Sequence, residues 1–437
     1  MSEKQNVLVF SGATYPAMQV IDCLKNHPRF HVIAAASYPN HSEYVCADTI
    51  TDLPFIHDER FLEAFKELLV TRRIAFVIPT DETIALVLKQ HEAELPAVVV
   101  CSPFETTVLC RHKQQMYEAL AGEEFLPRVY SAAAIDEITD YPLFIKPDEG
   151  QGAKGSRLIT HRAELDTVEN LADMVIAEYL PGDEYTVDCF TTKEGRLIFC
   201  NPRVRTRLMN GITARGHNIP CTAEFRTIIE RLNERLAFRG YWYVQLRRDR
   251  QGRLKLLEIC TRFAGSFAIS KGKGVNLPLL ALCDFSGLDT NLTENDYVVE
   301  CDKTYIDRYR LHFDYTHLYV DYDDTVTCNQ GQAVNPYVIA YLYQCKAKGV
   351  RVTLLTRHAA SFGEPLAESL RRLHIAPDLF DEIVELDWDT PKHTHIRDPK
   401  TSIFLDNSFA ERKSVQDRHH MPVFDVCNVD SLFDWRA

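Results

Sequence analysis

The sequence lacks three features that would assign a protein to a class at once. No stretch reaches the roughly 18 consecutive apolar residues that a membrane-spanning helix needs. The N-terminal region has one short apolar run, Val7–Phe10, without the layout of a secretory signal peptide. The 13 cysteines are scattered and include no C-x-x-C pair. We therefore expect a cytoplasmic protein with reduced, mostly buried cysteines and no membrane partner.

Positive charge is scarce relative to negative charge. The chain has 49 lysine and arginine residues against 62 aspartate and glutamate residues, a formal net charge of −13. This balance argues against nucleic acid as a partner. The composition, 46% hydrophobic and 25% charged, is ordinary for a globular protein. A length of 437 residues exceeds what one hydrophobic core supports, so we expect roughly two to four domains.

Strand-like and helix-like segments alternate over residues 1–105, which predicts a Rossmann-like domain with a parallel sheet. The expected strands are Asn6–Phe10, Phe30–Ala36, Ala75–Pro79 and Ala97–Val100, and the expected helices are Ala17–Leu24, Phe61–Val70 and Ile84–His91. The first turn contains only Gly12, whereas a dinucleotide fingerprint has three glycines. We therefore expect this domain to form a wall of a neighbouring site rather than to bind a nicotinamide cofactor.

A glycine-rich loop lies within Phe144–Thr160, with Gly150, Gly152 and Gly155 spaced G-x-G-x-x-G. A dinucleotide loop runs into a helix, but Ser156–Thr160 alternates like a strand. The pattern therefore favours a flap whose backbone N–H groups and lysines contact phosphates. Protein kinases have such a flap, but the sequence contains neither H-R-D nor D-F-G. A glycine-rich hairpin without function is the alternative.

Further segments in the same region carry polar side chains at the ends of predicted elements. Cys110–Leu120 is typical of a helix with Lys113 near its start, and Met174–Tyr179 is typical of a strand. Gly240–Arg247 and Arg253–Ile259 are expected strands that carry Gln245 and Glu258. A last strand is expected at Tyr305–Leu311. Asn201–Gly216 concentrates the arginines 203, 205, 207 and 215, and indicates either an anion-binding surface or a solvated run of charge.

The chain contains, in this order, Lys113, Lys146 with its glycine loop, VIAEYLPGDEYTVD, the Gln245 strand and LLEICTRFAGS. This order of motifs resembles the ATP-grasp superfamily. The resemblance is greatest to carboxylate–amine ligases and the large subunit of carbamoyl phosphate synthetase. It implies a pre-ATP-grasp domain over residues 1–105 and an α+β ATP-grasp domain over residues 106–312. It also implies ATP and Mg²⁺ as cofactors, with carboxylate and amine substrates joined through an acyl phosphate.

The resemblance implies roles for particular residues. Lys113, Lys146, Gly150, Gly152, Gly155 and Ser156 would contact the ATP phosphates; Glu178, Tyr179, Leu180 and Glu184 would contact adenine and ribose. Gln245 and Glu258 would hold Mg²⁺, which prefers oxygen ligands. Arg262 would meet the transferred phosphoryl group, and Arg205 and Arg215 would receive the anionic substrate.

The sequence departs from the ATP-grasp pattern at one residue. Relatives have Glu-x-Asn-x-Arg where this chain has Glu258, Cys260 and Arg262. A cysteine is a soft ligand and a poor partner for Mg²⁺, whereas asparagine supplies an oxygen. Either the remaining ligands suffice, or the metal site is weakened and ATP is bound without efficient ligation.

Four short motifs, DYDDT, LLT, a lysine and FLDN, follow one another between residues about 316 and 437. In this order they resemble the four motifs of the haloacid dehalogenase superfamily. The resemblance implies that Asp321 is a nucleophile, that Asp323 is a general acid and base, and that Thr356 and Lys392 hold phosphoryl oxygens. It also implies an Mg²⁺ site from Asp321, Asp323 and Asp406, and a phosphorylated small molecule as substrate. The short stretch between the first two motifs leaves no room for a large cap in this domain, 313–437.

The fold class that follows is α/β in three parts, and two functional hypotheses remain. The first is a bifunctional enzyme, a carbon–nitrogen ligase fused to an Mg²⁺-dependent phosphatase. The second is an active phosphatase whose ATP-grasp region only binds nucleotide and regulates, which Cys260 motivates. A scaffold without activity is disfavoured by the retained Lys146, Glu258 and Asp321. Whether the chain forms oligomers is left open.

Overall fold

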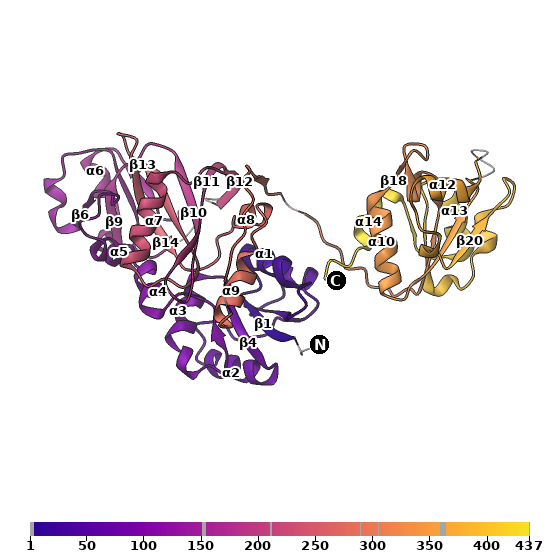
Figure 1. Cartoon of the computed structure of the whole chain (residues 1–437), viewed down its shortest axis with the longest axis horizontal. Helices are drawn as coiled ribbons and strands as arrows, with labels where there is room; N and C mark the ends of the chain where they lie inside the picture. The colour runs from indigo at the N-terminus through magenta and orange to yellow at the C-terminus, as the bar shows by residue number, and fades with distance from the viewer. Residues whose placement is uncertain are drawn as a thin grey trace. The chain divides into compact units, whose positions relative to one another are not determined.

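A computed structural model describes residues 4–150, 154–209, 212–288, 290–304, 306–358 and 364–436. The chain divides into two compact units, residues 1–306 with 436–437, and residues 307–435 (Figure 1). We refer to them as the first and second unit and describe each by itself. No helix among the described residues has the length and apolar character needed to cross a membrane.

The first unit begins with the predicted parallel α/β domain. Its five-stranded sheet has the order β3-β2-β1-β4-β5, and all of its strand pairs are parallel. The strands are β1 Gln5–Phe10, β2 Phe30–Ala35, β3 Thr49–Ile50, β4 Ile74–Pro79 and β5 Val98–Val99, and the helices are α1 Tyr15–Leu24, α2 Phe61–Thr71 and α3 Glu82–Gln90. Asp81 caps α3 by accepting the backbone N–H groups of Thr83 and Ile84. The cap fixes Glu82 as the first helical residue, directly beyond β4.

The predicted helix Cys110–Leu120 is in fact two helices. Helix α4, Phe104–Arg111, and helix α5, Lys113–Ala119, are separated by His112, whose backbone is extended (φ −100°, ψ 99°). The prediction was wrong here because apolar spacing does not register a break of one residue. The break makes Lys113 the first residue of α5, where its side chain is buried.

Two antiparallel sheets follow. A four-stranded sheet has the order β6-β9-β7-β8, and a six-stranded sheet has the order β14-β13-β10-β11-β12-β15. Their strands are β6 Val129–Tyr130, β7 Leu143–Pro147, β8 Arg157–Ile159, β9 Met174–Glu178, β10 Glu184–Thr191, β11 Leu197–Met209, β12 Ile212–Asn218, β13 Gly240–Arg248, β14 Leu254–Cys260 and β15 Glu300–Asp302. The helices are α6 Arg162–Leu165, α7 Ala223–Arg235, α8 Ala268–Gly272 and α9 Leu277–Phe285. The glycine loop thus joins two neighbouring strands, β7 and β8, as the sequence predicted.

The last strand was predicted in the wrong position. We expected Tyr305–Leu311, but β15 at Glu300–Asp302 is the strand that pairs with β12, and the described residues 306–311 form no strand. Charge explains the difference. Arg207 and Arg215 on the β11–β12 hairpin form ion pairs with Asp302 and Glu300 of β15. The edge strand is therefore selected by complementary charges, whereas apolar Ile306 remains 65% exposed.

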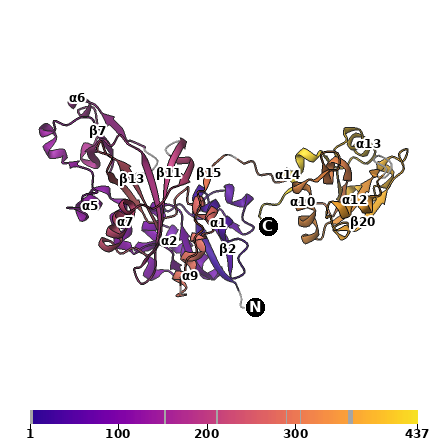
Figure 2. The same cartoon turned by 45° about the horizontal axis from the view of Figure 1, so that its top comes forward.

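The α/β domain and the six-stranded sheet share one hydrophobic core. Val20 and Ile21 of α1 belong to the same buried cluster as Leu277 and Ala281 of α9 and Tyr241 of β13. Figures 1 and 2 both show α9 alongside α1. A second cluster packs α7 against the other part of that sheet. The shared core explains why the two predicted domains form one compact unit.

The second unit is built on a five-stranded parallel sheet with the order β20-β19-β16-β21-β22. Its strands are β16 His317–Val320, β19 Arg351–Thr356, β20 Glu382–Glu385, β21 Ser402–Leu405 and β22 Val423–Phe424, and a small hairpin pairs β17 Thr327–Cys328 with β18 Ala333–Val334. The helices are α10 Pro336–Ala347, α12 Leu366–Arg372, α13 Phe409–His419 and α14 Val429–Leu432. The carboxyl ends of parallel strands share one edge of a sheet, so residues that follow β16, β19 and β21 meet there.

Candidate functional sites

A pocket in the first unit lies between the four-stranded and the six-stranded sheet. It is lined by eleven of the residues predicted from the sequence: Lys113, Lys146, Gly150, Ser156, Glu178, Tyr179, Leu180, Glu184, Arg205, Gln245 and Glu258. Gly155, Arg215 and Arg262 are described but are not part of this lining. Gly152 lies outside the described residues. Residues far apart in the sequence therefore converge on one cavity.

Two of the lysines in this pocket, Lys113 and Lys146, donate hydrogen bonds to backbone carbonyls. The Lys113 ammonium donates to the carbonyls of Asp148 and Gly150 at 3.0 and 3.4 Å. The Lys146 ammonium donates to the carbonyl of Leu257 at 2.6 Å and to the Tyr117 hydroxyl at 3.2 Å. Burial lowers the pKa of Lys146 to about 8, with Glu258 and Glu184 opposing the shift. An anionic ligand would relieve that desolvation and take over these hydrogen bonds.

Gln245 and Glu258 face one another across two strands. They are direct partners in the antiparallel register of β13 and β14, so both side chains project from the same face. Burial, and then the charge of Glu82, raises the pKa of Glu258, while Lys113 and Lys146 oppose the shift. A divalent cation would stabilise the ionised form. The donor set of one carboxylate and one amide suits Mg²⁺, which takes its remaining ligands from phosphates and water.

The glycine loop is anchored at its base and requires glycine at its end. The Asp148 carboxylate accepts the backbone N–H of Gln114 at 2.6 Å and contacts His112 at 3.2 Å. Gly155 has φ +75°, and a Cβ there would lie 2.9 Å from Cγ of Pro147. Lys154, from this loop, also lines the pocket and was not among the predicted contacts. A lysine between loop glycines was the sequence signal for it.

The residues predicted to contact adenine and ribose run from Glu178 at the end of β9 to Glu184 at the start of β10. Glu178 accepts the backbone N–H of Arg128 with its side chain and donates its own N–H to the Arg128 carbonyl, both at 2.9 Å. Glu184 is paired with the Arg205 guanidinium and lies 3.8 Å from that of Arg247. Arg205 and Glu184 therefore neutralise one another at the wall of the pocket.

The basic stretch predicted to receive an anion is matched by carboxylates. Arg203 pairs with Asp188, Arg205 with Glu184, Arg207 with Asp302 and Arg215 with Glu300. Arg203 and Asp188 are both fully buried, and Asp188 also accepts the Tyr241 hydroxyl at 2.6 Å. Burial opposes the charge of Arg203, but Asp188 outweighs it and raises the pKa of the guanidinium. The Arg203–Asp188 ion pair therefore links β11 to β10 within the six-stranded sheet.

Cys260 and Arg262 meet a carboxylate from the α/β domain. The Cys260 thiol donates to Oε1 of Glu82 at 3.5 Å, and Arg262 pairs with the same oxygen at 2.9 Å. Arg111 pairs with the other Glu82 oxygen, also at 2.9 Å. Glu82 and Arg111 were not predicted as site residues. The acidic residues directly after β4 were the available signal, since side chains gather at the carboxyl ends of parallel strands.

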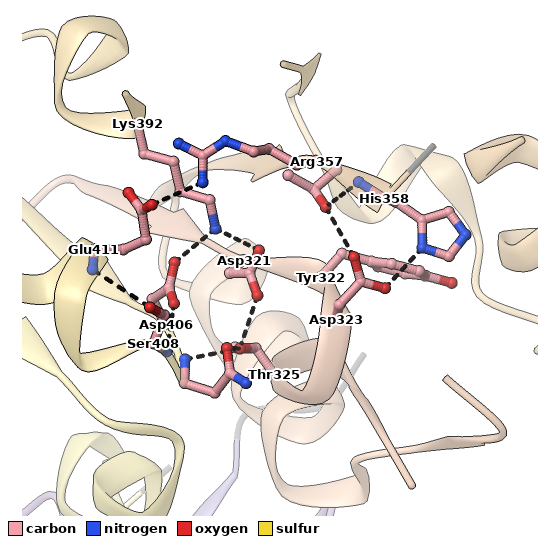
Figure 3. Close-up of polar contacts among 12 residues, drawn as sticks. Asp321, Tyr322, Asp323, Thr325, Arg357, His358, Lys392, Asp406, Ser408 and Glu411 are labelled. Carbon is pink, nitrogen blue, oxygen red and sulfur yellow. Dashed lines mark hydrogen bonds and ion pairs between the residues drawn. The ribbon is translucent and has the colours of Figure 1, made fainter. Parts of the chain in front are cut away.

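The five residues predicted in the second unit converge at the carboxyl edge of its sheet, and Figure 3 labels four of them, Asp321, Asp323, Lys392 and Asp406. The Lys392 ammonium lies 2.5 Å from Oδ1 of Asp321 and 2.7 Å from Oδ2 of Asp406. Thr356 donates to Oδ2 of Asp323 at 3.5 Å. Lys392 is buried, whereas the neighbouring Lys400 is exposed.

The electrostatics of this cluster favour a bound cation. Burial, and then the charge of Asp321, raises the pKa of Asp406 to about 7. Burial opposes the charge of Lys392, but Asp321 and Asp406 raise its pKa. In the described part of the chain no group of three histidine, cysteine or acidic side chains is arranged for a metal. Two carboxylates with phosphate oxygens are nevertheless an ordinary Mg²⁺ site.

Several contacts around this cluster were not predicted. Thr325 donates its hydroxyl to Asp321 at 3.1 Å and accepts the backbone N–H of Asn407 at 3.1 Å. Arg357 pairs with Glu411 of α13 at 2.7 Å. His358 contacts Asp323 at 2.7 Å. The motifs contained Thr325 and Asn407, but nothing in their spacing indicated these partners.

Comparison with known proteins bears on the first unit. Residues 170–305 match the model of a family described as "ATP-grasp in the biosynthetic pathway with Ter operon". A search of curated proteins found no match.

Solved structures agree on the fold. A biotin carboxylase from Campylobacter jejuni, described as a β-γ-ATP complex, matches with a TM-score of 0.57 and 13% identity, covering 66% of this chain and 72% of that one. N5-carboxyaminoimidazole synthetase from Staphylococcus aureus, complexed with ADP, matches with 0.56 and 18%, covering 68% and 80%. An L-amino acid ligase from Bacillus licheniformis matches with 0.52 and 18%, covering 64% and 74%. The family match covers part of the first unit, and these solved structures agree with that unit in fold.

The buried pair Arg203–Asp188 gives a prediction about stability. Arg203→Ala should lower the free energy of unfolding of the first unit by about 3–5 kcal/mol, because Asp188 is left buried and unpaired. Arg207→Ala is the control, since Arg207 is 47% exposed and its pair with Asp302 should contribute less than about 1 kcal/mol.

Urea denaturation measures both variants. Trp242 is fully buried in the first unit, and its fluorescence reports on that unit once Trp388 and Trp435 are replaced by phenylalanine. Equal losses for Arg203→Ala and Arg207→Ala would contradict the structural role of Arg203.

Proposed function

We propose that the chain is a bifunctional enzyme. The first unit is an ATP-dependent ligase that joins a carboxylate to an amine, and the second unit is an Mg²⁺-dependent phosphatase. The observation that carries the ligase proposal is the pocket between two sheets, lined by Lys113, Lys146, Gln245 and Glu258. The observation that carries the phosphatase proposal is the cluster of Asp321, Asp323, Thr356, Lys392 and Asp406.

In the ligase reaction an oxygen of the carboxylate substrate attacks the γ-phosphorus of ATP, and ADP leaves. The amine then attacks the acyl carbon, and phosphate leaves, so the products are an amide, ADP and phosphate. Lys113 and Lys146 stabilise negative charge on the phosphates through fixed ammonium groups. Gln245 and Glu258 would hold Mg²⁺, whose charge offsets that of the phosphates. The likeness to an L-amino acid ligase favours an amino acid among the substrates.

In the phosphatase reaction an oxygen of Asp321 attacks the phosphorus of a phosphate ester. The bond from phosphorus to the alcohol oxygen breaks, and that oxygen takes a proton from Asp323. Water then attacks the aspartyl-phosphate and gives its proton to Asp323, which releases phosphate. Lys392 and Thr356 hold the phosphoryl oxygens. Asp321 and Asp406 are the carboxylates that would hold Mg²⁺, because both lie beside Lys392 at the edge of the sheet. Asp323 contacts His358 and Thr356 instead.

A second candidate keeps the phosphatase and makes the first unit a nucleotide-binding regulatory module. Cys260 is the observation behind it, because a thiol at this position supplies no hard oxygen for Mg²⁺. In the structure Cys260 contacts Glu82 and is not part of the pocket lining, which favours the ligase.

Lys146 provides a test of the ligase. With ATP, Mg²⁺ and pooled carboxylates and amines, we expect ADP release that requires both co-substrates. Lys146→Ala should lower kcat about 100-fold, because a fixed donor to the phosphates is lost. The pKa of about 8 means that Lys146 is protonated below pH 8 and neutral well above it. The value of kcat/KM for ATP should therefore fall as the pH rises through 8.

Lys146→Arg is the matched control for the pH profile. Arginine keeps its charge throughout this range, so this decline should be absent in the variant. An unchanged pH profile in Lys146→Arg would refute the role of Lys146. Binding of ATP without any ADP release would favour the regulatory module.

Cys260→Asn separates the two candidates. If Cys260 impairs a metal site, asparagine should raise the rate of ADP release at least about tenfold. We expect a change of less than about threefold, because Cys260 faces Glu82. Cys328→Asn in the second unit is the control for unspecific effects. A gain confined to Cys260→Asn would contradict the ligase as the present activity.

Asp321→Asn tests the phosphatase. The substitution removes the nucleophile while retaining the shape of the side chain, so release of phosphate from p-nitrophenyl phosphate should fall about 10³-fold or more. Asp324→Asn is the control. The Asp324 carboxylate accepts the backbone N–H of Gln330 at 2.9 Å and has no role in the proposed reaction, so its loss should leave the rate within about threefold. Equal rates in wild type and Asp321→Asn would refute the assignment.

A further inference from the structure

His358 is a buried histidine that none of the four motifs includes. It lies two residues beyond the end of β19, and its exposed fraction is 2%. Its ring meets that of Tyr322 edge to face, with centroids 5.0 Å apart and planes at 83°. Its backbone N–H donates to the Thr356 hydroxyl at 3.1 Å. Packing and hydrogen bonding therefore fix the imidazole in one orientation.

The imidazole contacts one particular oxygen of the proposed general acid. Nδ1 of His358 lies 2.7 Å from Oδ1 of Asp323, while the other oxygen, Oδ2, accepts the Thr356 hydroxyl at 3.5 Å. An ionised carboxylate only accepts hydrogen bonds, so Nδ1 carries the proton in that state. In Figure 3 His358 lies on the side of Asp323 that faces away from Asp321 and Lys392. The imidazole therefore contacts the Asp323 carboxylate on the side opposite to Asp321 and Lys392.

The opposite edge of the ring faces a second carboxylate. Nε2 of His358 lies 3.8 Å from Oε2 of Glu364, and Glu364 is held by Arg372 through contacts of 3.2 and 3.0 Å. The hydrogen bonds from Arg372 lower the pKa of Glu364, so this carboxylate remains ionised. Asp323, His358, Glu364 and Arg372 thus form one chain of polar contacts that ends at the proposed catalytic carboxylate.

We propose that His358 is a positioning residue that orients the Asp323 carboxylate for proton transfer. The inference rests on the proposed phosphatase function. Because His358 holds Oδ1, the Asp323 carboxylate does not rotate freely. Oδ2 is then the oxygen that gives its proton to the leaving alcohol and later takes a proton from water. The imidazole touches neither the substrate nor the reacting atoms.

The alternative is that His358 only fills space beneath the site. The two readings differ in what happens to esters with different leaving groups. Protonation of the leaving oxygen matters for an alkyl phosphate, whose alkoxide is a poor leaving group. It matters little for p-nitrophenyl phosphate, whose phenolate leaves without help. A positioning role therefore changes the ratio of the two rates, whereas a loss of folded protein lowers both rates equally.

The experiment measures kcat/KM of the full chain with Mg²⁺ for both esters. His358→Ala should lower kcat/KM for the alkyl ester about 10- to 100-fold, which is less than the loss of a complete general acid would cause. The same variant should lower kcat/KM for p-nitrophenyl phosphate less than about threefold. His358→Asn should restore at least half of the loss on a logarithmic scale, because its amide N–H can donate to Asp323 as Nδ1 does. Asp323→Asn provides the full effect for comparison.

A double-mutant cycle isolates the coupling. If His358 acts only through Asp323, the double variant His358→Ala, Asp323→Asn should be no slower than Asp323→Asn alone. His317→Ala is the matched control, since His317 is also buried in this unit. His317 lies on β16 and contacts Thr353 of β19 at 2.8 Å. This control variant should leave the ratio of the two ester rates unchanged.

The outcomes are distinct. An unchanged ratio in His358→Ala, or additive losses in the double variant, would overturn the inference while leaving the phosphatase intact. If the wild type hydrolyses neither ester nor a wider panel of phosphate esters, the proposed phosphatase itself fails and the inference falls with it. A lowered ratio that is restored in His358→Asn and absent in His317→Ala supports the inference.

Discussion

A carboxylate buried in either unit requires a cation beside it, and much of the architecture follows from this requirement. Removing a carboxylate from water costs several kcal/mol unless a charge of opposite sign and hydrogen bonds compensate. In the first unit Arg203 meets Asp188 in the middle of the six-stranded sheet. In the second unit Lys392 joins Asp321 to Asp406 at the edge of the parallel sheet. The first pair joins the successive strands β10 and β11, whereas Asp321 and Asp406 follow β16 and β21, which are far apart in the sequence.

The two buried pairs differ in whether a ligand can replace the partner. Asp188 has its oxygens occupied by Arg203 and Tyr241, so it has no capacity for a further ligand. Asp406 lies beside a second carboxylate, and its pKa is raised to about 7 despite Lys392. One ammonium group therefore does not fully compensate two buried carboxylates. A bound cation would offset the remaining negative charge of Asp321 and Asp406, whereas Arg203 already offsets that of Asp188.

Candidate site residues could be predicted from the sequence where they belong to a motif. They could not be predicted where only the fold brings them to the site. The glycine loop between two strands and the Gln245–Glu258 pair were predicted, because strand patterns determine which side chains share a face. His358 and Glu82 were not predicted as site residues, because each reaches its site from an element that the motifs do not include.

The errors have the same origin. A charge-matched edge strand at Glu300–Asp302 has no apolar pattern, so periodicity directed the prediction to 305–311. Arginines in a basic stretch suggested an open anion site, but Arg207 and Arg215 pair with Asp302 and Glu300 of β15, a strand that is far away in the sequence. Pairing of charges across a sheet is decided by topology, which local patterns do not contain.

Glu82 changes how the cysteine at position 260 should be understood. Sequence alone suggested the loss of a metal ligand from one strand. The structure adds a carboxylate from the α/β domain that contacts the thiol and engages both Arg111 and Arg262. Its negative charge also contributes to the raised pKa of Glu258. A phosphoryl group at Arg262, which the sequence resemblance implies, would have to compete with Glu82 for the guanidinium. Cys260 therefore has to be considered together with the charged groups around it, Glu82, Arg111 and Arg262. These groups come from two domains of the first unit.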